Sequence, residues 1–133
     1  MAFAAAVVAA QNYMKEVSAK GKAGALAKAR RMAFDPVVYA SLREVLGGRA
    51  QWIVAGGAPL DPELMAFFRG AGVPVYEGYG LTETTAPCAF NPLGVPYHQG
   101  SVGVAFPGFE LRIAEDEEIQ VKGTAGVPEV PQD

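Results

Sequence analysis

Two glycine-containing segments of this 133-residue chain, Gly56–Pro59 and Gly78–Thr85, hold residues suited to bind a nucleotide with a metal ion. Glycines let a ligand approach the backbone closely. Tyr79 could stack on a base, and the Thr82 hydroxyl could donate a hydrogen bond to a phosphate oxygen. Glu83 could bind Mg²⁺, which takes one or two carboxylates together with phosphate oxygens and water. A Thr-Glu pair is also common at helix caps, so the residues alone leave both interpretations open.

Both segments should follow neighbouring strands of an α/β unit. Residues 51–55 predict a short buried strand, a helix begins at Asp61-Pro62 and ends at Arg69, and residues 73–77 predict the next strand. A β–loop–α–β unit of this length is typical of a parallel crossover. Ligands of open α/β sheets bind at the carboxyl ends of the strands, which is where the two segments are expected.

The residues before this unit predict helices over 1–19 and 23–33, because apolar residues recur there at helical spacing. The stripe expected to face the core in the first helix is Phe3, Val7, Met14 and Val17. Asp35-Pro36 predicts the start of a third helix, which Gly47-Gly48 should end. The buried face expected for this third helix is Val38, Leu42, Val45 and Leu46.

The second half of the chain is rich in Gly and Pro, and residues 78–108 predict a long loop. Residues 109–113 and 119–122 alternate apolar and polar side chains, which predicts a β-hairpin with residues 115–118 as its solvated turn. The expected fold class is therefore α/β, with a partial parallel sheet and flanking helices followed by an antiparallel β-hairpin segment.

Composition and charge exclude several classes of protein. Half of the residues are apolar, which argues against disorder, and a single cysteine rules out an internal disulfide. Residues 1–50 hold eight basic and three acidic side chains, and residues 51–133 hold three and eleven. The basic residues lie on helical sequence and predict a solvated face, with a phosphate- or membrane-facing patch as the alternative; no nucleic-acid partner is expected. The apolar run at residues 1–10 is about half a membrane span and lacks a signal peptide's basic flank, so a cytoplasmic location is expected.

The chain closely resembles the adenylate-forming, or AMP-binding, enzymes in the segment Glu77–Glu83 (E-G-Y-G-L-T-E), which follows Gly56–Leu60 (G-G-A-P-L). These enzymes include acyl-CoA synthetases, nonribosomal adenylation domains and beetle luciferases. The segments G-S-V-G, P-G and E-I-Q-V-K-G continue the resemblance in order up to residue 123. The sequence Y-E-G-Y-G-L-T-E-T, which follows a Lys-rich helical stretch, is most similar to that of the long-chain fatty acyl-CoA synthetase branch.

The resemblance implies a ligase that activates a fatty acid with ATP and Mg²⁺, forming an acyl-adenylate and pyrophosphate, and then transfers the acyl group to coenzyme A. It implies that Tyr79 packs on one face of the adenine, with the G-G-A-P loop on the other. It also implies that Thr82 and Glu83 are the catalytic residues, with Thr82 on the phosphate and Glu83 on the metal. The residues implied to bind the nucleotide are Gly57, Ala58, Pro59, Glu77, Gly78, Tyr79 and Gly80.

The chain departs from this family's pattern in what it lacks. The phosphate loop with its lysine, the aspartate that holds the ribose, and the C-terminal domain with the adenylation lysine are not found. We therefore expect an internal fragment of the large N-terminal domain that carries one wall of the ATP site and is inactive alone. Residues 1–95 would belong to the α/β part, 96–123 would begin a β-barrel-like subdomain, and 124–133 would form a flexible tail.

Other interpretations stay open at this stage. A non-catalytic nucleotide-binding or interaction module could use the same sequence, and luciferase-like oxidation shares the same motifs. The fragment is expected to self-associate through its sheet edges, and peripheral membrane contact is expected of the intact enzyme. Trp52 should be core or, alternatively, line an acyl tunnel. Cys88 should be a small buried or half-buried side chain, and His98 a solvated loop residue.

Overall fold

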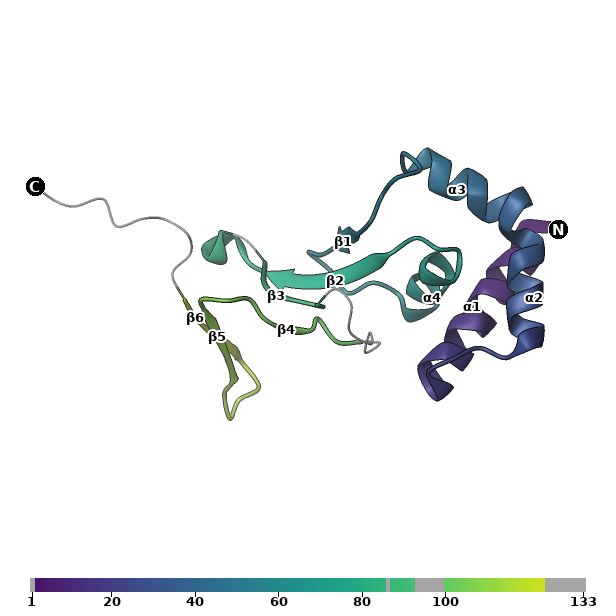
Figure 1. Ribbon diagram of the computed structural model, residues 1–133. Helices are drawn as coiled ribbons and strands as arrows, with labels where there is room; N and C mark the ends of the chain where they lie inside the picture. Colours follow the sequence, from purple (N-terminus) through teal and green to yellow (C-terminus); the bar gives the residue numbers. More distant parts are fainter. Residues whose placement is uncertain (1, 86, 93–99, 124–133) are drawn as a thin grey trace, which may run out of the picture.

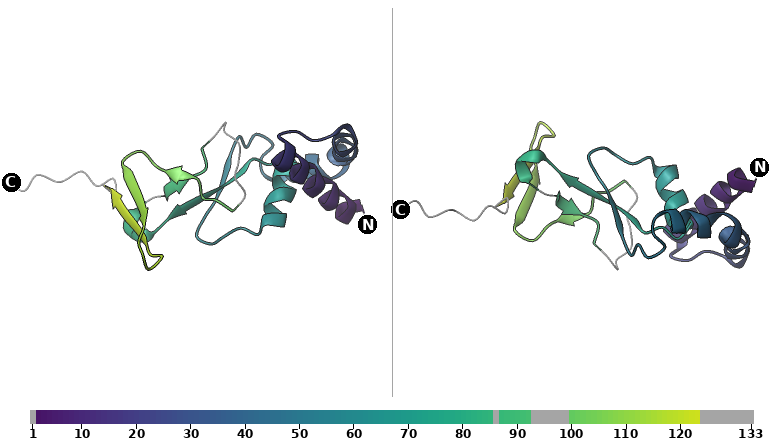
Figure 2. Two further views of the ribbon diagram at one scale, coloured as in Figure 1. Left: turned by 90° about the horizontal axis from the view of Figure 1, so that it is seen from below. Right: turned by 90° about the horizontal axis from the view of Figure 1, so that it is seen from above.

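The computed structural model describes residues 2–85, 87–92 and 100–123, and it arranges them as three successive regions (Figure 1). Helices gather at the N-terminal end, a mixed four-stranded sheet follows, and a two-stranded hairpin lies at the opposite end (Figure 2). The predicted fold class is confirmed, because a parallel strand pair with flanking helices precedes an antiparallel hairpin.

The first two helices confirm the prediction, with α1 at Ala2–Lys20 and α2 at Ala25–Phe34. The buried face of α1 differs from the predicted stripe, because Ala6, Ala9 and Ala10 are buried whereas Phe3 is 59% exposed. Small side chains are required here, since a Cβ atom on Gly70 of a later helix would collide with the Ala10 carbonyl. The close approach of two backbones, rather than side-chain size, therefore decides which face of α1 is buried.

The third helix does not begin at Asp35-Pro36 as predicted. The π-helical turn η1 (Asp35–Tyr39) joins α2 directly to α3 (Ala40–Val45), and no side chain caps it. Proline has no amide hydrogen to donate within a helix, and a wider turn relieves this conflict without ending the helix. The predicted end is confirmed, since the amide of Gly47 donates to the Glu44 carbonyl.

The buried face of this third segment was also predicted wrongly in part. Val45 is 84% exposed and Leu46 is 40% exposed, whereas Tyr39 is completely buried. The π-helical turn advances the chain differently from an α-helix, so an i, i+4 pattern counted through it selects the wrong side chains. Val38 and Leu42 are partly buried and pack against the core, as predicted.

The central unit confirms the predicted parallel crossover. Strand β1 (Ile53–Ala55), helix α4 (Pro62–Gly70) and strand β2 (Val75–Gly80) follow one another, and Ile53 pairs with Val75 in parallel register. The Asp61 carboxylate accepts a hydrogen bond from the Leu64 amide at 2.9 Å, which caps α4 as predicted.

Helix α4 lies between the two parts of the core. Its face toward the other helices joins a cluster of buried residues consisting of Ala6, Ala10, Tyr39, Phe67 and Ala71. Its face toward the sheet joins a second cluster consisting of Met65, Val73 and Val75. Of the two neighbouring rings on this helix, Phe67 is buried and Phe68 is partly buried.

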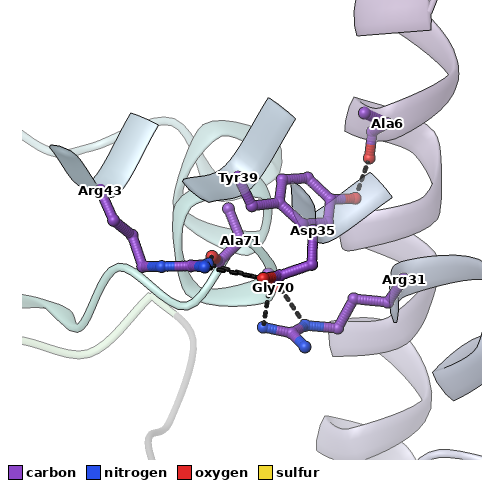
Figure 3. A network of polar contacts seen from close by, with 7 residues as sticks. All are labelled: Ala6, Arg31, Asp35, Tyr39, Arg43, Gly70 and Ala71. Carbon is purple, nitrogen blue, oxygen red and sulfur yellow. Dashed lines mark hydrogen bonds and ion pairs between the residues drawn. The ribbon is translucent and has the colours of Figure 1, made fainter. Parts of the chain in front are cut away.

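A polar network holds the helical region to the C-terminal end of α4 (Figure 3). Arg31 donates to the Gly70 carbonyl at 2.6 Å, and Arg43 donates to the Ala71 carbonyl at 2.7 Å. Both carbonyls lie at the end of a helix, where carbonyl groups lack helical partners and cations are favoured. Asp35 accepts two hydrogen bonds from Arg43, which hold the pKa of its carboxyl below the usual value.

Tyr39 ties the same helices together from inside the core. Its hydroxyl donates to the Ala6 carbonyl at 2.6 Å, and burial raises the pKa of this hydroxyl. The Arg31 guanidinium lies 5.9 Å from the centre of the Tyr39 ring, so the ring contacts both a backbone carbonyl and a cation.

The segment predicted as one long loop contains two strands and a helical turn. After β2 come the 3-10 turn η2 (Thr82–Thr84), strand β3 (Pro87–Phe90) and strand β4 (Val104–Ala105). These strands extend the sheet in the order β1-β2-β3-β4, with antiparallel pairing of β2 with β3 and of β3 with β4. The high local content of Gly and Pro predicted a loop. The strand pairing could not be predicted from it, because this pairing depends on contacts between segments far apart in the sequence.

The predicted hairpin is confirmed as β5 (Phe109–Ile113) and β6 (Ile119–Gly123), with residues 115–118 exposed in its turn. Cys88 is buried as predicted. Trp52 is 56% exposed, so the prediction of a core position was wrong, because β1 is an edge strand of this sheet. The predictions for His98 and the tail 124–133 lie outside the described residues. Within the described part of the chain, no helix is both long and apolar enough to cross a membrane.

Candidate functional site

The two glycine-containing segments lie side by side because of the β1–β2 pairing. Ala55, the last residue of β1, pairs with Glu77, so Gly56 follows directly beside Gly78. A Cβ atom on Gly56 would lie 3.1 Å from the Gly78 carbonyl oxygen, which shows how close the two backbones are. The parallel register therefore brings together segments that are about 20 residues apart in the sequence.

A cavity of about 480 Å³ opens between these segments. All seven residues that were predicted to bind a nucleotide line it, from Gly57 to Pro59 on one side and from Glu77 to Gly80 on the other. Sequence reasoning did not assign a role to the remaining lining residues, which are Ala55, Leu60, Pro62, Leu81, Gly100 and Val102. The G-S-V-G segment could have pointed to Gly100 and Val102, since it belonged to the resemblance.

Glu77 links the two sides of the cavity. Its side chain comes from β2 and is buried, with only 9% of the residue exposed. One carboxylate oxygen accepts a hydrogen bond from the Leu60 amide at 3.3 Å. This contact holds the loop that follows β1 against the strand that carries Tyr79.

Glycine is needed at two positions of the cavity for different reasons. Gly57 has a φ of +86°, a left-handed conformation that side chains disfavour. A Cβ atom on Gly78 would lie 3.3 Å from a methyl carbon of Val54 on the neighbouring strand. Tyr79, between Gly78 and Gly80, is half-buried and is the one aromatic residue among the described residues that line the cavity.

Thr82 and Glu83 do not line this cavity; they lie on the adjacent turn η2, and both are exposed. Glu83 instead lines a second cavity of about 270 Å³ that reaches the hairpin residues Phe109 and Val121. Leu81 borders both cavities. The turn thus places Thr82 and Glu83 next to the cavity that the seven predicted nucleotide-binding residues line, but not in its lining.

The alternative that the Thr-Glu pair caps a helix does not hold for Thr82 or Glu83, since the side chain that bonds the N-cap backbone of η2 is that of Thr84. Thr84 stabilises this turn instead: its hydroxyl accepts from the Leu81 amide and donates to the Leu81 carbonyl, both at 2.9 Å. Thr82 and Glu83 are both exposed to solvent, so a ligand could reach their side chains.

The donor set fits a metal ion that arrives with a nucleotide better than a resident metal. Among the described residues, no group of three His, Cys, Asp or Glu side chains could hold a metal ion. Mg²⁺ keeps several waters and binds through one or two carboxylates plus substrate phosphates, so Glu83 alone could be its protein ligand.

The cavity is mainly apolar, with polar groups from Glu77, Tyr79 and the glycine backbones. None of the described residues that line it is a lysine or an arginine. The site can hold a flat, mostly apolar ring between a loop and a strand and can offer it backbone donors and acceptors. Among the residues that the structure describes, the lining supplies no positively charged side chain for a triphosphate.

The comparison with protein families decides the assignment: the AMP-binding enzyme family matches residues 3–128. The chain belongs to the AMP-binding enzyme family. Its match extends over both the helical region and the sheet, so the helices are part of the family's shared sequence and not an addition to it.

Similar curated proteins are fatty-acid–CoA ligases. The chain is 46% identical over 111 residues to the long-chain-fatty-acid–CoA ligase FadD15 of Mycobacterium bovis, covering 81% of this chain and 18% of that protein. It is 36% identical over 98 residues to long-chain-fatty-acid–CoA ligase 6 of Rattus norvegicus, covering 73% of this chain and 14% of that protein. The chain therefore spans less than a fifth of the length of these relatives.

Proposed function

We propose that this chain forms one wall of the ATP and acyl-adenylate site of a long-chain fatty acid–CoA ligase. The observation that carries the proposal is that seven residues, predicted to contact one nucleotide, line a single cavity in a member of the AMP-binding family. The names of the similar ligases support fatty acid and coenzyme A as the substrates of the intact enzyme.

In this proposal the cavity binds the adenosine part of the ligand. The Tyr79 ring stacks on one face of the adenine, and Gly57–Pro59 cover the other face. Stacking of a base on an aromatic side chain is worth about 1–3 kcal/mol. The backbone around Glu77 and Gly78 then faces the edge of the base, where its polar groups can bond the exocyclic amino group.

The turn η2 would lie at the phosphate end of the ligand, since Leu81 connects the cavity to the turn that carries Thr82 and Glu83. The Thr82 hydroxyl would donate to a phosphate oxygen, and Glu83 would hold Mg²⁺. The metal, when bound, neutralises charge on the phosphate oxygens while the fatty acid carboxylate attacks and pyrophosphate leaves.

We propose that the 133-residue chain does not catalyse this reaction alone, because the described lining of its cavity carries no cationic side chain. Phosphoryl and adenylyl transfer depend on positive groups that neutralise the phosphates. The measurement is pyrophosphate release with ATP, Mg²⁺ and palmitate. The expected rate equals that of a Glu83→Ala control, and a clearly higher rate would show that the chain is a working enzyme.

The binding site itself can be tested by nuclear magnetic resonance titration of the chain with AMP. We expect shift changes at the amides of Gly57, Ala58 and Glu77–Gly80, and none at the hairpin turn 115–118. Tyr79→Ala should weaken the binding about tenfold, while the matched Tyr79→Phe, which keeps the ring, should bind as the unaltered chain does. Shift changes confined to other residues would contradict the proposal.

A calorimetric titration with an acyl-adenylate analogue separates this proposal from a self-sufficient nucleotide-binding module. A wall of a larger site should bind the analogue weakly, because most ligand groups have no partner in this chain. Micromolar affinity would instead favour the module.

We also propose that the isolated chain self-associates through β1. This strand pairs with β2 on one side and is the first strand of the four-stranded sheet, so its other edge has no neighbour within the described sheet. Val54 on β1 is 40% exposed and Trp52 just before it is 56% exposed. An unpaired apolar edge favours pairing with a second copy. Sedimentation should show a concentration-dependent dimer that Val54→Lys abolishes; a Val54→Lys chain that dimerises equally would contradict this.

A further inference from the structure

We infer that Asn91 is a positioning residue that holds one wall of the cavity, Gly100–Val102, at a fixed distance from the strand that carries Glu77. The inference rests on the proposed function for the identity of the ligand, but its contacts stand on the structure alone. No sequence motif pointed to Asn91, which follows directly after β3.

Asn91 is a buried polar residue with 4% of its surface exposed. Its side-chain nitrogen donates to the Ser101 carbonyl at 2.6 Å and to the Glu77 carbonyl at 3.3 Å. Its backbone amide also donates to the Glu77 carbonyl, at 3.2 Å. Asn91 therefore bridges the site strand and the segment that contains Ser101.

The chemistry of these contacts requires an amide group. Both partners of the side-chain nitrogen are carbonyl oxygens, which only accept hydrogen bonds, so the NH₂ group and not the oxygen must face them. The NH₂ group has two hydrogens and can serve both carbonyls. An aspartate of the same size would turn a negative oxygen toward two acceptors in a buried place, which is unfavourable.

Ser101 lies between the two wall residues, since Gly100 and Val102 both line the cavity. The segment that contains Ser101 also lies in close contact with the end of β3. A Cβ atom on Gly103 would collide with the Phe90 carbonyl, and the Gly103 amide donates to the Ser101 hydroxyl at 3.1 Å. Asn91 supplies the side-chain contact that fixes the Ser101 backbone in this arrangement.

Glu77 is thus the common support of two segments that line the cavity. Its carboxylate accepts from Leu60 and holds the loop after β1, while its backbone carbonyl accepts from Asn91 and, through it, holds the 100–102 segment. The positions of these two segments around the cavity depend on both contacts. A ligand that touches both segments loses contacts with one of them if the other moves away.

The test compares Asn91→Asp with a matched control, Asn12→Asp, which makes the same chemical change at an exposed position of α1. Hydrogen exchange reports the wall directly. Asn91→Asp should speed exchange at the Gly103 amide at least tenfold and leave the Ile53 amide, which donates to Pro74 in the sheet, unchanged. AMP affinity, measured by resonance titration, should fall about fivefold or more. The control should change neither quantity.

Each outcome decides the inference. Unchanged exchange at Gly103 would overturn it, and equal acceleration at Ile53 would show a general structural role instead. Faster exchange at Gly103 with unchanged AMP affinity would also overturn it, because the wall would not matter for the ligand. If the unaltered chain does not bind AMP, the proposed function fails for this chain, and exchange alone still decides whether Asn91 holds the wall. A second variant, Asn91→Ser, keeps one donor and should give an intermediate exchange rate at Gly103 and an intermediate AMP affinity. It serves as the test if the aspartate variant does not fold.

Discussion

The helical region and the sheet region of this protein hold their backbones in place by different means. In the helical region, alanines and the rings of Tyr39 and Phe67 form the buried core, and two arginines bond the carbonyls that end α4. In the sheet region, the cavity is lined mostly by glycines and short side chains, with Glu77 and Asn91 bonding backbone groups. The helical region is thus held by buried packing and by bonds to helix-end carbonyls, whereas the sheet region leaves backbone groups open to a ligand.

The largest contrast should appear when a tyrosine is truncated in each region. Tyr39→Ala should lower the free energy of unfolding by about 3–5 kcal/mol, because a fully buried ring leaves a cavity. Tyr79→Ala should cost about 1 kcal/mol or less, since its ring is half-buried at an open site. Urea denaturation of both variants measures this, and equal losses would contradict the comparison. Tyr39→Phe, which loses only the bond to Ala6, should cost about 1 kcal/mol.

A second contrast uses glycine-to-alanine changes at two crowded positions. Gly70→Ala should lower the free energy of unfolding by about 1–3 kcal/mol, because its Cβ meets the Ala10 backbone between two packed helices. Gly123→Ala, at the end of the hairpin, should cost less, because the Phe109 ring can rotate away and the Gly108 carbonyl, 2.7 Å from the added Cβ, lies on an exposed turn that can shift. The thermal unfolding midpoints of the two variants measure this difference. A larger drop in the midpoint for Gly123→Ala would show that the end of the hairpin is packed more tightly than the contact between α1 and α4.

A smaller effect should depend on pH. The pKa of Asp35 is lowered chiefly by its hydrogen bonds with Arg43, so its stabilising contribution is present above the unfolded pKa of about 3.9 and is lost as the pH falls through the folded value. Asp35→Asn should therefore destabilise the chain at pH 7 by no more than about 1 kcal/mol, because the carboxylate side chain is 36% exposed. Denaturation at a series of pH values should show the difference between the two proteins shrinking as the pH falls below the unfolded pKa; a difference that stays constant with pH would refute this origin.

The smallest effect is expected in the hairpin. Lys122 and Glu110 form an ion pair at 3.3 Å with side chains that are 81% and 77% exposed. Exposed pairs contribute about 0–1 kcal/mol, so Lys122→Ala should leave the thermal midpoint almost unchanged. A marked loss of stability would show that the hairpin is held by more than its backbone pairing.

Much of the fold could be predicted from local patterns. The capping residue Asp61 and the helix end at Gly47-Gly48 depend on backbone chemistry within a few residues, and the structure confirms both. The long loop over 78–108 was wrong because β3 and β4 exist only through pairing with distant segments. The predicted helix start at Asp35-Pro36 was wrong for a related reason, because the contact of Arg43 with a carbonyl at the end of α4 stabilises a continuous helical segment there.

The sequence by itself determined the two glycine-containing segments, the strand–helix–strand order between them and the family to which the residues belong. Only the tertiary structure decided which residues share a cavity, because the parallel register of β1 and β2 sets Ala55 beside Glu77. It also decided that Trp52 is exposed and that Tyr39 is buried, since burial depends on which elements cover a side chain. Asn91 belongs to the same category: its two carbonyl partners are 10 and 14 residues away, and only folding brings them to one nitrogen atom.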